Sequence, residues 1–276
     1  MTNETIIRKT KNILNDKGNN LPRFDTISKI YPRTNENITD TYNLFDLQNK
    51  DILTVISSSD HIFCAILNDI NSITSFDLNI LTKYYYHLKK ALIETYDLNK
   101  FKKVLFDNLI DKGILKEKTY LEFRDKIDKE YRDFWDEIIN YSLIKNIPLN
   151  KLFLKTSHNI DLVNYLKEEN YKLLKEKIES TDITFIQSDI TLLHKKLEGS
   201  YDYMFLSNIS DYLTIFKTKQ YAETKLLNHL NKNGQIAYAY MFGVPKHIIK
   251  RYQTNNVYQV DSSIQDAKDY VLTIKR

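Results

Sequence analysis

Short apolar runs alternate with amphipathic helical patterns along much of this chain. Residues 51–56 form a short apolar, β-branched run typical of a buried strand, and residues 72–76 are expected to form a second strand. A short helical pattern follows the first run at 61–68, and a long one follows the second at 81–95. Strands and helices that alternate over so few residues are typical of a parallel sheet covered by helices. We therefore expect an α/β fold.

Over about 97–180 the pattern is helical throughout. One stripe at helical spacing runs from Phe123 to Ile138, with charged residues on the opposite face. We predict a helical insertion between the second and third strands. Trp135 lies in this insertion and is expected in the core, with the wall of a pocket as the alternative.

Strand patterns return after residue 180, and the last two are close enough to pair as neighbours. They lie at 183–186, 201–206, 235–241, 257–260 and 270–274, which brings the expected total to about seven strands. We predict a mostly parallel, Rossmann-like sheet in one domain over 51–276. Residues 1–50 are polar and irregular, and we expect them to form an N-terminal cap segment.

The composition narrows the class of protein. With 5 glycines and 4 prolines in 276 residues, low-complexity and turn-dense all-β classes are excluded. The single cysteine, Cys64, excludes an intrachain disulfide framework and fits a reducing cytosol. The longest apolar run spans 236–242, whereas a membrane span needs about 20 residues. We expect a cytoplasmic protein without a transmembrane segment, and peripheral membrane contact stays open.

Charge and motif content bear on the partners. Residues 217–276 carry 10 Lys and Arg against 4 Asp and Glu. A solvated surface accounts for this excess, and a basic patch facing nucleic acid or anionic lipid is the alternative. We expect no nucleic-acid partner. The six histidines show no i,i+4 pair, so we also expect no metal site.

Short polar side chains follow the first four predicted strands. In open parallel sheets, ligands bind outside the carboxyl ends of the strands, where the strand order switches direction. The candidate ligand-binding residues are Ser57, Ser58, Ser59 and Asp60 after the first strand, Asp77 and Asn79 after the second, Ser188 and Asp189 after the third, and Ser207 and Asn208 after the fourth. Asp211 and Tyr212 follow one turn later.

Three carboxylates in this set have two possible roles each. Asp77 suits the hydroxyls of a ribose, or the N-cap of the helix at 80–95. Asp189 suits an adenine amino group, or the cap of a helix at 191–196. Asp60 suits a ligand ammonium, or the start of its helix. The first loop has no glycine, which counts against NAD, FAD and ATP but suits a nucleoside without phosphates.

Four stretches resemble S-adenosylmethionine-dependent transferases, in particular the family of the diacylglycerol 3-amino-3-carboxypropyltransferases of betaine-lipid synthesis. Residues 51–60 are similar to the family's "vLTigSSGDn" loop, and residues 75–79 to its "vDlNp". Phe134-Trp135 falls where the family often has Phe-Trp, and residues 201–211 resemble the strand with its "LSNI" end. The resemblance covers roughly residues 30–276. Ser59 stands where the family usually has glycine, and the chain is shorter than the lipid-making members.

This resemblance implies a class I methyltransferase-type sheet and S-adenosylmethionine as the cofactor. The favoured function is transfer of a 3-amino-3-carboxypropyl group to a small-molecule or lipid-like acceptor. The alternatives are methyl transfer to a small molecule and a non-catalytic binding protein with the same fold. Asp211, Tyr212 and Glu36 are candidates to take the acceptor's proton. Arg33 is a candidate to hold the cofactor's carboxylate, or else a surface arginine. The oligomeric state is left open.

Overall fold

The computed structural model describes residues 1–16, 25–155, 162–209, 224–241, 243–244, 256–262 and 266–276. The chain falls into two compact units. One contains Met1–Arg33, Ser57–Ser59 and Leu78–Thr156, and we call it the helical unit. The other contains Thr34–Ile56, Asp60–Asp77 and Ser157–Arg276, and we call it the sheet unit. The predicted division at residue 50 stays a prediction.

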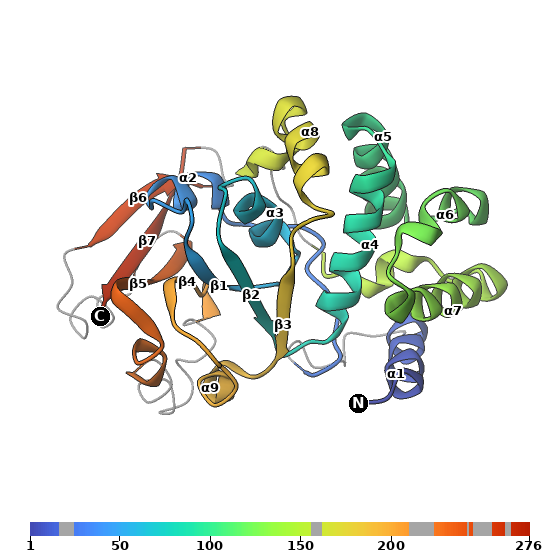
Figure 1. Ribbon diagram of the computed structural model, residues 1–276. Helices are drawn as coiled ribbons and strands as arrows, with labels where there is room; N and C mark the ends of the chain where they lie inside the picture. The colour runs from blue at the N-terminus through green and yellow to red at the C-terminus, as the bar shows by residue number, and fades with distance from the viewer. Residues whose placement is uncertain (17–24, 156–161, 210–223, 242, 245–255, 263–265) are drawn as a thin grey trace. The chain divides into compact units, whose positions relative to one another are not determined.

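The sheet unit holds a seven-stranded sheet with the order β3-β2-β1-β4-β5-β7-β6 in the described part of the chain (Figure 1). The neighbours from β3 to β5 are parallel, whereas β7 runs antiparallel to both β5 and β6. The strands are β1 (Asp51–Val55), β2 (Ser72–Asp77), β3 (Ile183–Gln187), β4 (Tyr201–Phe205), β5 (Leu230–Met241), β6 (Val257–Asp261) and β7 (Lys268–Lys275). The predicted Rossmann-like, class I methyltransferase-type sheet is confirmed, as is the pairing of the last two strands.

Both faces of this sheet are packed, so its central strands bury apolar side chains on both sides. Successive side chains of a strand point to opposite faces, so Met204 and Phe205 of β4 lie on different sides. Met204 packs in a buried cluster with Leu193, and Phe205 contacts the ring of Tyr42 with the ring centroids 4.4 Å apart. The helices of this unit include α2 (Ile38–Asn43), α3 (Asp60–Ile66), η5 (Asn164–Leu166), α8 (Glu168–Lys177) and α9 (Ile190–Leu193).

Helices occupy the described chain between β2 and β3, which confirms the predicted helical insertion. The helical unit contains α4 (Leu81–Thr95), α5 (Leu98–Lys102), the π-helix η1 (Lys103–Lys112), α6 (Glu117–Phe123), η2 (Arg124–Lys126), α7 (Lys129–Lys145) and η3 (Leu149–Leu152), together with the N-terminal α1 (Asn3–Asn15). Trp135 of α7 is 1% exposed, and its indole N–H donates to the carbonyl of Tyr84 at 3.0 Å. The expectation that Trp135 belongs to the core is therefore confirmed.

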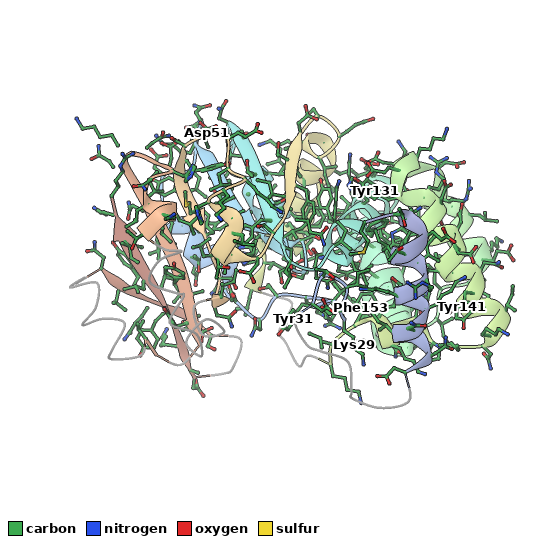
Figure 2. The ribbon with its side chains drawn as sticks, turned by 90° about the horizontal axis from the view of Figure 1, so that it is seen from below. Lys29, Tyr31, Asp51, Tyr131, Tyr141 and Phe153 are labelled. Carbon is green, nitrogen blue, oxygen red and sulfur yellow. The ribbon has the colours of Figure 1, made fainter. Side chains whose placement is uncertain are left out.

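Two contacts tie the N-terminal residues into the helical unit. The side-chain amide of Asn15 on α1 donates to the hydroxyl of Tyr141 on α7 at 2.7 Å. Farther along, Ile30 forms an isolated parallel bridge with Phe153, which places Lys29 and Tyr31 beside that residue (Figure 2). No helix in the described ranges is long and apolar enough to cross a membrane.

Candidate functional site

The strand order of the sheet switches direction between β1 and β4, and ligands of such sheets bind outside the carboxyl ends of the strands at this point. In the sheet unit, Asp60 begins α3 after β1, and Ser207 follows β4. Glu36 comes from the segment before α2, and its carboxylate contacts the Ser207 hydroxyl. These three side chains form the centre of the candidate site.

Asp60 is a buried carboxylate with partners on two other segments. It is 2% exposed; Oδ1 accepts from the hydroxyl of Tyr165 at 2.7 Å, and Oδ2 accepts from the backbone N–H of Thr34 at 2.7 Å. Its negative charge in the first turn of α3 is also favoured by the dipole of the helix. Asp60 thus starts its helix, which was one of its two expected roles. Its contact with a ligand ammonium stays a prediction.

Glu36 is the second buried carboxylate, at 6% exposure. The Ser207 hydroxyl donates to its Oε1, and Nε2 of His61 lies 3.4 Å from its Oε2. Its own backbone N–H donates to Oγ1 of Thr34 at 3.0 Å, so Thr34 contacts both Asp60 and Glu36. The two carboxylates are therefore linked through one short segment.

The hydroxyl of Tyr42 contacts His61 at two atoms. It lies 3.4 Å from Nδ1 of His61 and 3.2 Å from the carbonyl oxygen of the same residue. Burial raises the pKa of the Tyr42 hydroxyl well above its ordinary value, so the hydroxyl keeps its proton and donates it to the carbonyl oxygen of His61. Tyr42 thus holds His61 in place beside Glu36.

The ends of β2 and β3 lie side by side at the same edge of the sheet. Asp77, the last residue of β2, is paired with Gln187, and its carbonyl accepts from the N–H of Ser188 at 3.0 Å. Asp189 caps α9, because its Oδ1 accepts from the N–H of Thr191 at 2.7 Å. This was one of the two roles expected for Asp189. The roles of Asp77 and Asp189 toward ribose and adenine stay predictions.

The loop Ser57–Ser59 belongs to the helical unit and takes an unusual backbone conformation. Ser57 has φ of 43° and Ser59 has φ of 72°, in the left-handed region that favours glycine. Ser59 thus adopts a backbone conformation that favours glycine, which is the residue usual at this position in the family that the sequence resembles. Ser59 is fully buried, and its hydroxyl has no hydrogen-bond partner among the described residues.

Asn79 uses its side-chain amide within the helical unit. Its Oδ1 accepts from the backbone N–H groups of Ser28 at 3.2 Å and Leu81 at 3.1 Å. Its Nδ2 donates to the carbonyl of Ser28 at 3.0 Å. Asn79 thus supplies a side-chain acceptor for the first turn of α4 and fixes residue 28 beside it. Its role toward a cofactor stays a prediction.

Arg33 is held on the same unit by one charged and one aromatic neighbour. Its Nη2 donates to Asp111 at 3.0 Å, and its guanidinium carbon lies 4.8 Å from the centroid of the Phe106 ring. The Nε of Arg33 is buried without a hydrogen-bond partner among the described residues. This donor fits the predicted contact with a ligand carboxylate, which no contact in the structure tests.

The remaining predicted residues are only partly described. Oδ1 of Asn208 lies 3.4 Å from the Ser207 hydroxyl, at the edge of the Glu36 contact. Asp211 and Tyr212 fall outside the described residues. Sequence reasoning missed His61 and Tyr165 as members of the site. His61 directly follows Asp60 in the sequence, and this position could have indicated its place in the site. Tyr165 is one of 20 tyrosines, and no neighbouring residue in the sequence distinguishes it from the others.

No family model matches this sequence, and the search of curated proteins gave no match either. Among solved structures, the chain is similar to the N-methyltransferase NodS from Bradyrhizobium japonicum in complex with S-adenosyl-L-homocysteine, at 9% identity and a TM-score of 0.43 over 98% of both chains. It is also similar to the rRNA methyltransferase aviRa from Streptomyces viridochromogenes, at 10% identity and a TM-score of 0.43 over 95% of this chain and 89% of the other. The strand order, with β7 antiparallel to both of its neighbours, defines the fold of this chain.

Proposed function

We propose that this chain binds S-adenosylmethionine and transfers a carbon group from it to a small-molecule or lipid-like acceptor. The observation that carries the proposal is the pair of buried carboxylates, Glu36 and Asp60, at the switch point of the sheet. Two carboxylates at this point of the sheet suit a cationic ligand, and S-adenosylmethionine carries both a sulfonium and an ammonium.

The residues at the strand ends supply contacts for the rest of the cofactor. We assign Asp77 to the ribose hydroxyls, Asp189 to the adenine amino group and Asp60 to the ammonium. The glycine-free loop Ser57–Ser59 agrees with a ligand that has no phosphates, because it lacks the glycines that let a backbone approach a diphosphate closely. The resemblance to the aminocarboxypropyltransferases supports the same cofactor.

The chemistry asks the protein mainly to align two reactants and to accept one proton. A nucleophile X–H on the acceptor attacks the γ-carbon of the methionine chain, so an X–C bond forms and the C–S bond breaks. The electron pair of that bond stays on sulfur, and methylthioadenosine leaves. We propose that the carboxylate of Glu36 accepts the proton of the nucleophile. Its contacts with Ser207 and His61 hold the carboxylate in place.

The by-product distinguishes this reaction from methyl transfer. The purified protein is incubated with S-adenosylmethionine and a cell extract, and both by-products are quantified by mass spectrometry. We expect methylthioadenosine above the level of spontaneous cofactor breakdown, which is measured without protein and with a Glu36→Gln variant. S-adenosylhomocysteine without methylthioadenosine would establish a methyltransferase. Bound cofactor without either by-product would support the non-catalytic alternative.

The nature of the acceptor is tested by dividing the extract before the reaction. One portion is treated with nucleases, and another is separated into lipid and aqueous fractions. We expect activity to survive nuclease treatment, because the chain shows only a dispersed basic excess at its C-terminal end. Loss of activity after nuclease treatment would identify nucleic acid as the acceptor and contradict that expectation.

A further inference from the structure

The turn that ends η1 and the turn that follows α7 are joined side by side within the helical unit. The backbone N–H of Leu149 donates to the carbonyl of Gly113 at 2.9 Å. The side-chain amide of Asn150 donates to the carbonyl of Asp111 at 3.1 Å. Gly113 has φ of 70°, and a β-carbon at this residue would lie only 2.7 Å from Cβ of Pro148. The residues that flank these contacts are therefore neighbours in space.

Apolar side chains are exposed at both turns. Ile114, directly after Gly113, is 51% exposed. Leu143 and Ile144, in the last turn of α7, are 45% and 70% exposed. The helix ends there because Asn146 takes the left-handed conformation, with φ of 51°. Single exposed apolar residues are ordinary, whereas several at adjoining turns are typical of an interaction surface.

The charge around these side chains is positive. Three exposed lysines lie within two residues of the exposed isoleucines, namely Lys112, Lys116 and Lys145. The carboxylate of Asp111 at the same turn is offset by the guanidinium of Arg33, 3.0 Å away. The whole helical unit carries 23 Lys and Arg against 15 Asp and Glu, whereas the sheet unit carries 17 against 21. A positive surface of this kind favours an anionic partner.

We propose that this surface, which we call the lysine–isoleucine surface, docks on membranes that contain anionic lipids. It consists of Lys112, Ile114, Lys116, Leu143, Ile144 and Lys145. The aliphatic side chains enter the boundary between head groups and acyl chains, and the lysine ammonium groups reach the lipid phosphates. Nucleic acid fits less well, because bases stack on aromatic side chains or arginine, whereas aliphatic side chains and lysines form this surface. Membrane docking of this kind is independent of the proposed reaction.

Sedimentation of the full chain with lipid vesicles tests the proposal. One set of vesicles contains phosphatidylcholine with about 30% phosphatidylglycerol, and the other contains phosphatidylcholine alone. We expect the chain to bind the anionic vesicles at least about tenfold more tightly than the neutral ones. Raising the salt concentration from about 0.1 to 0.5 M should remove most of this preference, because salt screens the lysines from the lipid phosphates.

Two double variants remove the two kinds of contact separately. The first combines Ile114→Ser with Ile144→Ser, and the second combines Lys112→Gln with Lys145→Gln. Each should weaken binding to the anionic vesicles by about tenfold or more, because insertion of the apolar side chains and attraction of the lysines both contribute.

Matched controls make the same kinds of change elsewhere. Leu192→Ser alters a leucine of the sheet unit that is 48% exposed. Lys126→Gln with Lys129→Gln removes two exposed lysines near the start of α7, about 24 Å along the helix from Lys145. Each control should change vesicle binding by less than about threefold.

Four outcomes overturn the proposal without touching the proposed function. They are the absence of a preference for anionic vesicles, unchanged binding in the isoleucine variant, unchanged binding in the lysine variant, and equal losses in the controls. Binding of a duplex oligonucleotide in place of vesicles, lost in the lysine variant, would assign the surface to nucleic acid. Thermal melting shows that each variant is folded. If the double isoleucine variant does not melt cooperatively, Ile144→Ser alone takes its place under the same criteria.

Discussion

Replacing Asp77 with alanine is expected to weaken S-adenosylmethionine binding by at least about tenfold, because the ribose would lose two charge-assisted hydrogen bonds of about 1.5–3 kcal/mol each. Stability should change little. The alternative role of Asp77, as the cap of the helix after β2, is weakened by the contact of Asn79 Oδ1 with the N–H of Leu81. Calorimetric titration of the wild-type protein and of Asp77→Ala gives the affinity for S-adenosylmethionine, and thermal melting of both gives the stability.

A matched control for Asp77 is an aspartate that only caps a helix. Asp97 is the N-cap of α5, and its carboxylate accepts from the N–H of Lys100 at 2.8 Å. Asp97→Ala should cost about 1 kcal/mol of stability and leave the affinity unchanged. If Asp77→Ala behaves in the same way, with a lower melting temperature and normal affinity, Asp77 does not bind the ribose.

Replacing Glu36 with glutamine should reduce by-product formation by about 100-fold or more, because a general base contributes typically 10²–10⁴ in rate. The amide keeps the size of the side chain and an acceptor for the Ser207 hydroxyl, but it cannot take a proton at neutral pH. Affinity for S-adenosylmethionine should also fall, because one of the two negative charges is lost, but by less than the rate. The rate is measured as methylthioadenosine formed in the presence of extract, and the affinity by titration.

The Ser207→Ala variant distinguishes the role of the Glu36 carboxylate from the role of its hydrogen-bond donor. This variant removes one donor to Glu36 but leaves the carboxylate, so its rate should fall by about tenfold or less. If Glu36→Gln forms methylthioadenosine as fast as the wild-type protein, the role of the buried carboxylate is purely structural. Equal losses in both variants would show that the contact between the two side chains, rather than proton transfer, limits the reaction.

Strand positions were predictable because buried parallel strands are rich in apolar and β-branched residues, as in 51–56 and 201–206. The start of β5 was predicted at residue 235, but the strand begins at Leu230 and includes the pair Asn233-Gly234. The pairing with β4 shifts register between Tyr201 and Tyr203, and Asn233 has φ of 69° within the strand. The pair Asn233-Gly234, which is typical of a turn, thus lies within the strand as an irregularity.

Only the site residues at the ends of strands could be predicted from the sequence. Asp60, Asp77 and Ser207 follow strands, so their place at one edge of the sheet follows from parallel pairing. The contacts of Asp60 with Thr34 and Tyr165 join residues 26 and 105 positions apart. Such contacts depend on how loops pack over the sheet, and no local pattern encodes them.

Binding of S-adenosylmethionine is the measurement that tests the account most directly. Calorimetric titration of the folded protein should give one saturable site per chain with a Kd between about 1 and 100 μM. Adenosine alone should bind more weakly, because it lacks the ammonium and sulfonium that the buried carboxylates favour. No saturable binding up to about 1 mM, in protein that melts cooperatively, would contradict the account.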